Sequence, residues 1–269
     1  MTQIKCSLPA IACIMFFSMA TIAGAVTIES VKPGENVFQY VKRVKGSFDH
    51  GLYQKVIGAA NTYKEGDEAL GVAADDDVSR AYARMLLANT KIKDIHENPL
   101  FEDNLQKLIW KTTDSAQYEK IKDKTMGELK KKLLTQSEPD IKAIMGGLNS
   151  DVIGSIVKLM SNEELTAVGK KIFTTLPGSK LGSKGYLGAR IQPNSPTDNH
   201  EDIVWQVFNG WSYATGDVVL GTNPVSDSVE NIAAIEKGLK EVLVTFGIGK
   251  EMPWCVLAHV DKQVEVEKK

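Results

Sequence analysis

Three short apolar segments decide the fold of this chain: residues 186–191 (YLGARI), 218–221 (VVLG) and 254–260 (WCVLAHV). Each has a length typical of a buried β-strand. The stretches between them, residues 198–211 and 227–246, carry apolar side chains at helical spacing. This order of strands and helices predicts a parallel sheet, because successive parallel strands need a covering helix to return the chain. This part of the sequence is therefore α/β.

Two acidic pairs mark where these helices begin. Asp198 with Glu201 precedes the first helix, and Asp227 with Glu230 precedes the second. A side-chain acceptor followed three residues later by a carboxylate can satisfy free amide groups in the first helical turn. Gly247 can end the second helix, because glycine readily adopts the left-handed conformation found at many helix ends.

The segment of residues 177–185 (PGSKLGSKG) separates two textures of sequence, since it is rich in chain-breaking residues. Before it the sequence is rich in helix formers broken by short polar turns, and Ser161 with Glu164 forms a candidate capping box. We therefore predict a mainly helical region, residues 26–180, followed by the α/β region, residues 181–269.

Residues 1–25 form a separate leader. Lys5 is followed by a nearly uncharged run, residues 7–25, that ends in an Ala-Gly-Ala sequence. This pattern is typical of a secretory signal peptide that is cleaved after Ala25. The alternative is a retained membrane anchor, because the run is close to the ~20 apolar residues that span a bilayer. We expect an exported or periplasmic protein.

The composition excludes two classes of function. The chain has 32 basic and 34 acidic residues and a formal net charge of -2, so it offers no concentrated positive charge for nucleic acid. Its four histidines lack the spacing of metal ligands: His50, His96, His200 and His259. Cys255 alone lies beyond the leader, and its apolar neighbours favour a small buried core residue over a nucleophile.

Polar side chains stand where each predicted strand ends. Arg190 and Gln192 close the first strand, Asn223 follows the second, and His259 lies in the third segment. The carboxyl ends of parallel strands carry the active site in α/β folds, because only the strand ends project polar groups into a cleft. Arg190 and Gln192 are two residues apart and so point the same way. The alternative to an active-site role is that each side chain only forms a structural hydrogen bond. For each residue taken singly, and for His259 above all, this alternative is favoured.

At these strand ends the sequence resembles the large subunit of ethanolamine ammonia-lyase. Residues 189–194 (ARIQPN) resemble the A-R-L-Q-P-N element of that family, and residues 221–225 (GTNPV) and 255–260 (CVLAHV) match further elements in order. A weaker similarity begins earlier, at residues 66–67 (GD) and 71–74 (GVAA), so the resemblance covers most of the chain after about residue 60 and leaves out the leader.

The resemblance implies a (β/α)₈ barrel of the TIM type preceded by helices. Because such a barrel takes ~250 residues, residues 181–269 would hold its first βα units, with about three strands, and the barrel would be incomplete. The implied reaction converts ethanolamine to acetaldehyde and ammonia with adenosylcobalamin. The implied partner is the small subunit. The chain is either part of a longer large subunit or one piece of a split subunit whose barrel a separate chain completes, and we expect this chain to be inactive alone.

The resemblance also implies roles for particular residues. Arg190, Gln192 and Asn223 match positions that bind the substrate, and Arg190 would stabilise charge on the substrate oxygen as the catalytic group. Pro224 matches a position that borders the cobalamin, most of whose contacts would lie outside this chain.

Two alternatives stay open. The chain can be an exported, non-catalytic binding protein, or a decayed fragment derived from the same family. For localisation, the family resemblance favours the cytoplasm or a bacterial microcompartment, whereas the leader favours export.

Overall fold

The computed structural model describes residues 25–214 and 217–269. The chain separates into two compact units, of which the first ends at Val168 and the second comprises Gly169–Lys269. The predicted leader lies outside the described residues, apart from Ala25. Within the described ranges, no helix is both long and apolar enough to cross a membrane.

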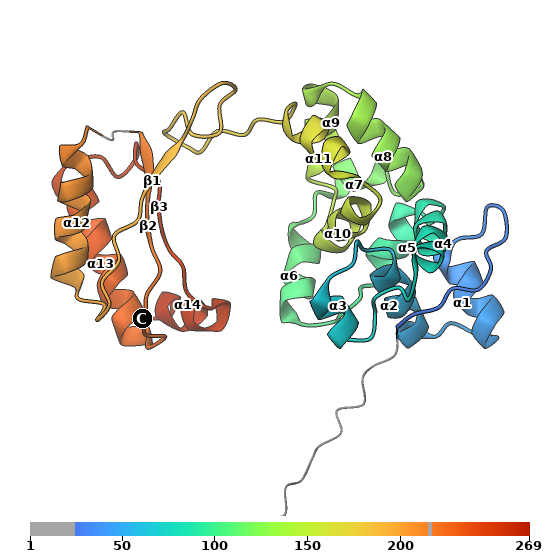
Figure 1. Ribbon diagram of the computed structural model, residues 1–269. Helices are drawn as coiled ribbons and strands as arrows, with labels where there is room; N and C mark the ends of the chain where they lie inside the picture. The colour runs from blue at the N-terminus through green and yellow to red at the C-terminus, as the bar shows by residue number, and fades with distance from the viewer. Residues whose placement is uncertain (1–24, 215–216) are drawn as a thin grey trace, which may run out of the picture. The chain divides into compact units, whose positions relative to one another are not determined.

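The first unit is helical, as the sequence predicts (Figure 1). Its described helices are α1 (Val37–Lys45), α2 (His50–Ala59), α3 (Glu65–Ala69), α4 (Asp77–Ala88), α5 (Ile92–Glu97), α6 (Asn104–Thr112), α7 (Ser115–Glu119), α8 (Met126–Thr135), α9 (Glu138–Met145), α10 (Ser150–Lys158) and α11 (Asn162–Gly169).

Side-chain caps and an apolar interior explain this helical unit. The predicted capping box is confirmed, since Ser161 N–H donates to Glu164 Oε2 at 2.9 Å and Glu164 N–H donates to Ser161 Oγ at 3.2 Å. The helices bury apolar side chains against one another, and seven of the described helices contribute residues with no exposed surface: Val37, Val56, Leu86, Ile92, Leu129, Ile141 and Val152. Burying such side chains is the main term that stabilises a helical domain.

The second unit contains a parallel sheet in the order β1-β2-β3. Its elements are β1 (Ala189–Ile191), α12 (His200–Ser212), β2 (Val218–Thr222), α13 (Val229–Thr245), β3 (Trp254–Val256) and α14 (Val260–Glu267). The predicted order of strands and helices is confirmed. The second unit is therefore α/β, with an open sheet of parallel strands. That this sheet is part of a (β/α)₈ barrel stays a prediction.

The first and third strands are shorter than predicted. Tyr186 belongs to a turn, because its N–H donates to the carbonyl of Ser183 at 3.2 Å, and β1 starts only at Ala189. β3 ends at Val256, and the chain then turns so that His259 becomes the residue preceding α14. Apolar composition therefore extended both strand predictions into neighbouring turns.

The predicted helix starts are displaced by one residue. Asn199 caps α12 by accepting a hydrogen bond from Asp202 N–H, and Ser228 caps α13 by accepting one from Asn231 N–H. Asp198 does not cap α12, because its backbone is left-handed, with φ at 54°, and its carboxylate turns toward another loop. The predicted end of α13 is confirmed, since Gly247 has a φ of 68°.

The core of the second unit lies between the sheet and two helices. In Figure 1, α12 and α13 cover the same face of the strands. Val218 and Leu220 of β2 point into this layer, where they pack among buried residues of the two helices: Ile203, Val207, Ile235, Leu239, Val242 and Leu243. Because side chains alternate along a strand, the residues between these two positions point to the opposite face of the sheet.

Candidate functional site

The strand register brings the predicted site residues to one edge of the sheet. Arg190 pairs with Val219 on β2, and Gly221 pairs with Cys255 on β3. Continued by two residues, this register sets Gln192 beside Gly221, at the carboxyl edge where Asn223 follows β2. Arg190, Gln192 and Asn223 therefore lie on neighbouring strand ends.

These residues also share one face of the sheet. Val218 and Leu220 face the helices, so Val219, Gly221 and, by continued alternation, Asn223 point to the opposite face. Arg190 pairs with Val219, and Gln192 lies two residues further along the same strand. The side chains of Arg190, Gln192 and Asn223 are all exposed. Arg190 lies on the face that α12 and α13 leave uncovered, and strand alternation carried on past the ends of β1 and β2 would present the carboxamides of Gln192 and Asn223 on the same face.

The Arg190 side chain lies across the middle strand at a glycine. A Cβ atom on Gly221 would come within 2.8 Å of Arg190 Nη2, 3.1 Å of Arg190 Cζ and 2.9 Å of Cys255 Sγ. Carbon atoms cannot approach that closely, so a side chain at this position would displace the guanidinium or the thiol. The absence of a side chain at Gly221 therefore leaves room for Arg190.

Cys255 lies on the same face as Arg190. It is half-buried, and the register places it opposite Gly221 rather than among the core residues between the sheet and the helices. The prediction that Cys255 is a buried core residue is therefore wrong. Its apolar neighbours in the sequence misled the prediction, because Trp254 and Val256 pack against the core while Cys255 points the other way.

Asn194 ties the end of β1 to the end of β2. Its Oδ1 accepts a hydrogen bond from Thr222 Oγ1 at 3.1 Å and a longer one from Asn223 N–H at 3.5 Å. Its backbone is held in turn by Gln206 of α12, whose Nε2 donates to the Asn194 carbonyl at 2.7 Å. Sequence reasoning missed this role, because no local sequence pattern predicts that a side-chain amide will form hydrogen bonds between two strand ends.

Asp198 holds the loop that follows β2. Its carboxylate accepts hydrogen bonds from Val225 N–H at 2.8 Å, Ser226 N–H at 2.6 Å and Asn231 Nδ2 at 2.7 Å. Burial disfavours the charged form, but these hydrogen bonds outweigh it, so the pKa of Asp198 lies below its ordinary value. Sequence reasoning took Asp198 only for a helix start.

Asp217 performs a similar task just before β2. It accepts hydrogen bonds from Ser179 Oγ at 2.7 Å and from Lys180 N–H at 2.9 Å. These hydrogen bonds lower the pKa of Asp217, with Ser179 the largest cause. They fasten residues 177–185 to the sheet at the amino end of β2, away from the edge that carries Asn223.

His259 is exposed and pairs through Nδ1 with the Asp261 carboxylate. This contact matches the structural hydrogen bond that sequence reasoning favoured for His259. Among residues 25–214 and 217–269, no group of three histidine, cysteine or acidic side chains could hold a metal ion.

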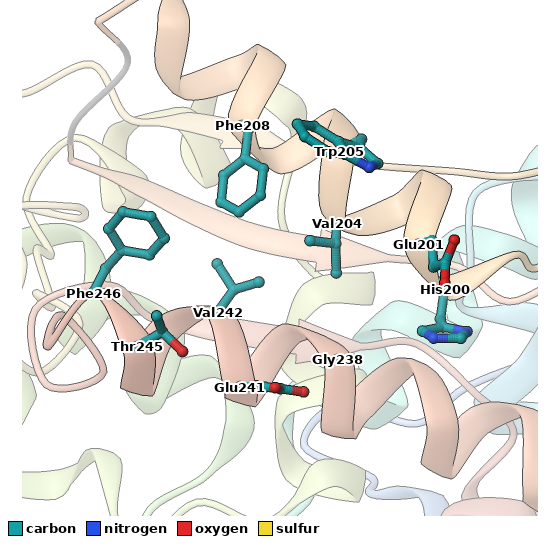
Figure 2. A pocket seen from close by; sticks show the side chains of 10 residues that line it. All are labelled: His200, Glu201, Val204, Trp205, Phe208, Gly238, Glu241, Val242, Thr245 and Phe246. Carbon is teal, nitrogen blue, oxygen red and sulfur yellow. The ribbon is translucent and has the colours of Figure 1, made fainter.

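An apolar groove lies between α12 and α13, with a volume of about 330 Å³ (Figure 2). Val204 and Phe208 of α12 face Val242 and Phe246 across it. The groove is lined by residues of the helical layer and none of the strand-end residues, so it is separate from the candidate site at the sheet edge.

Fold and site together define a class of protein. This is a parallel α/β protein that presents an arginine and two carboxamides at the carboxyl edge of its sheet, an arrangement suited to a small polar molecule with hydrogen-bonding groups.

Comparison with known proteins identifies the family. The model of the family "Ethanolamine ammonia lyase large subunit (EutB)" matches residues 48–269. The chain is 34% identical over 236 residues to the ethanolamine ammonia-lyase large subunit of Salmonella typhimurium strain LT2, covering 86% of this chain and 49% of that protein. It is 33% identical over 236 residues to the protein of the same name from Escherichia coli strain K12, with the same coverage. The chain belongs to the ethanolamine ammonia-lyase large-subunit family, and it spans about half the length of these relatives.

Proposed function

We propose that this chain forms the substrate-binding part of an ethanolamine ammonia-lyase large subunit, with β1, β2 and β3 as the first strands of a (β/α)₈ barrel. The observation that carries the proposal is the parallel register of β1 and β2, which brings the strand ends that bear Arg190, Gln192 and Asn223 to one edge of the sheet. The names of the relatives supply the substrate, ethanolamine.

The three side chains suit an amino alcohol. The carboxamide oxygens of Gln192 and Asn223 accept hydrogen bonds from an ammonium group, and their NH₂ groups donate to a hydroxyl oxygen. Arg190 donates to the same oxygen and stabilises negative charge that develops on it as the amino group leaves carbon. Radical chemistry demands that a small substrate be held in one orientation, so rigid placement matters more here than a strong acid or base.

The carboxyl edge fits adenosylcobalamin as one wall of its site. Pro224 is half-buried beside Asn223, and the neighbouring Val225 and Leu257 expose apolar side chains at this edge. When bound, adenosylcobalamin supplies the radical that abstracts hydrogen from the substrate. Pro224 borders that cofactor, and the remaining contacts come from other parts of the enzyme.

Completion of the barrel requires further strands. The outer edges of β1 and β3 have no strand partner among the described residues, and the face that carries Arg190 is the one that α12 and α13 leave uncovered. An unpaired sheet edge exposes backbone N–H and C=O groups that can form hydrogen bonds with another strand. Further strands from the same polypeptide or from a separate chain therefore close the barrel. The small subunit of the enzyme is the second partner, and the chain alone is inactive.

The leader favours a second candidate function. An exported protein of this family would work as a non-catalytic ethanolamine-binding protein or would be a decayed copy. The reason is that the lyase needs adenosylcobalamin and its partner chains in the same compartment. The basic start, apolar run and Ala-Gly-Ala sequence of residues 1–25 support export.

Reconstitution separates these functions. The full chain is combined with the small subunit and with the C-terminal half of the Salmonella typhimurium large subunit, and acetaldehyde is measured after ethanolamine and adenosylcobalamin are added. We expect turnover in the complete mixture, none from the chain alone, and a loss of about 100-fold or more with Arg190→Ala. Ethanolamine binding without turnover in the complete mixture would support the binding protein instead.

A further inference from the structure

The dipeptide Asn223-Pro224 lies in a loop that is held from both sides by the preceding loop of the fold. On one side, Asn194 Oδ1 accepts from Thr222 Oγ1 and Asn223 N–H. On the other side, the Asp198 carboxylate accepts from the backbone N–H groups that follow Pro224. The proline between these anchors fixes its own φ and restricts the residue before it to extended backbone. Few conformations are left for Asn223.

Asp198 is built for this task. Only 8% of its surface is exposed, and its backbone adopts a left-handed φ of 54°, which aspartate and asparagine tolerate better than most residues. Its own N–H donates to the Ser195 carbonyl at 3.1 Å, and Asn199 N–H donates to Ser195 Oγ at 3.2 Å, so the turn that carries it is itself fixed. The carboxylate is therefore held in place before it meets the second loop.

The acceptor capacity of Asp198 is used by three donors from one neighbouring segment. Val225 N–H contacts both oxygens, at 2.8 and 3.0 Å, while Ser226 N–H and Asn231 Nδ2 contact Oδ2 at 2.6 and 2.7 Å. Asn231 lies in the first turn of α13, so the same carboxylate joins the loop after β1, the loop after β2 and the start of the next helix. Hydrogen bonds to an ionised acceptor are about twice as strong as neutral ones.

We propose that Asp198 is a positioning residue for substrate binding: its carboxylate sets the backbone after Pro224 and thereby aims the Asn223 carboxamide at the amino alcohol. The inference rests on the proposed function, because it concerns how that same site is held. Asp198 itself touches no substrate in this account.

The test compares three variants of the full chain. Asp198→Asn keeps the size of the side chain and its tolerance for a left-handed backbone. It replaces one carboxylate oxygen with an NH₂ group, which cannot accept the hydrogen bonds that this oxygen accepts. The double variant Asp198→Asn/Asn231→Asp exchanges the two side chains, so that the carboxylate comes from position 231 in α13 and the NH₂ group from position 198. Asp227→Asn is the matched control, since Asp227 is an exposed aspartate of the loop after β2, the loop that Asp198 contacts. Backbone hydrogen exchange at Val225 and Ser226 is measured by NMR, and ethanolamine affinity is measured by calorimetry on the reconstituted complex.

We expect Asp198→Asn to accelerate exchange at both amides and to weaken ethanolamine binding by about tenfold, because small misplacements of a binding group are costly. The double variant should recover most of both losses, and Asp227→Asn should change neither. A purely structural role would lower the unfolding midpoint but leave the affinity of the folded complex unchanged.

Two results would overturn the inference: exchange at Val225 and Ser226 that stays at the wild-type rate in Asp198→Asn, or faster exchange with unchanged ethanolamine affinity. If the wild-type complex does not bind ethanolamine, the proposed function fails instead. In that case the positioning role in substrate binding fails with it, while the exchange rates still decide whether Asp198 holds the loop.

Discussion

At the scale of single residues, Gly221 is the glycine whose side chain, if it had one, would meet Arg190 of the candidate site directly. Its missing side chain makes room for the Arg190 guanidinium and the Cys255 thiol, both of which would lie within 3 Å of a Cβ atom. We expect Gly221→Ala to destabilise the second unit by about 1–3 kcal/mol through overpacking and to weaken ethanolamine binding by displacing Arg190.

Gly238→Ala provides the control for that substitution. Gly238 lies inside α13, where a Cβ would meet only Val204 Cγ2 at 3.7 Å, an ordinary contact distance. Because alanine is the better helix former, this variant should gain about 0.5–1 kcal/mol. Urea unfolding of both variants checks the pair, and a Gly221→Ala protein as stable as the wild type with unchanged affinity would refute the crowding argument.

Single residues also show where sequence reasoning succeeds and fails. The adjacency of the strand ends that bear Arg190, Gln192 and Asn223 could be predicted, because the order of strands and helices alone indicates which parallel strands share an edge. Asp198 could not be assigned its role, since its donors lie 27 to 33 residues further along the chain and depend on a left-handed backbone angle. Cys255 was misjudged because its two neighbours are core residues while it faces the other way.

At the scale of elements, the link between the loops after β1 and β2 predicts a pH dependence. The pKa of Asp198 is lower in the folded protein than the ordinary value of about 3.9 expected when the chain unfolds. A carboxylate with a depressed pKa stabilises the fold above its unfolded pKa, and that contribution is lost as the pH falls through the folded pKa. The advantage of the wild type over Asp198→Asn should therefore be full at pH 7 and shrink below about pH 4.

Urea unfolding at both pH values, followed by tryptophan fluorescence, checks this dependence. Three of the four tryptophans lie in the second unit, namely Trp205, Trp211 and Trp254, so the signal reports mainly on the relevant elements. Other acidic groups titrate equally in both proteins and cancel in the difference. A difference that is the same at pH 7 and pH 3 would show that the Asp198 charge does not stabilise this link.

The elements themselves were largely predictable, whereas their ends were not. Helical periodicity located α12 and α13, and apolar runs located all three strands. The caps moved by one residue, to Asn199 and Ser228, because any short polar side chain near a helix start can serve and only the backbone geometry selects one. β1 starts later and β3 ends earlier than predicted, because the apolar sequence extends into the neighbouring turns.

At the scale of the whole molecule, the sheet of the second unit has one covered and one uncovered face. The covered face buries Val218 and Leu220 against α12 and α13, which accounts for the local fold. The uncovered face carries the candidate site and ends at two strand edges without partners among the described strands. The α/β class and the family could be predicted from the sequence, whereas the proposed barrel could not be tested on the three described strands.

Ethanolamine affinity tests the central claim most directly. Calorimetric titration of the reconstituted complex is carried out with the wild type, Gln192→Ala, Asn223→Ala and the double variant. If both carboxamides hold one amino alcohol, each single variant should bind about tenfold more weakly, and the double variant should depart from the sum of the two free-energy losses because the groups share a ligand. Affinities that match the wild type in all three variants would contradict the account.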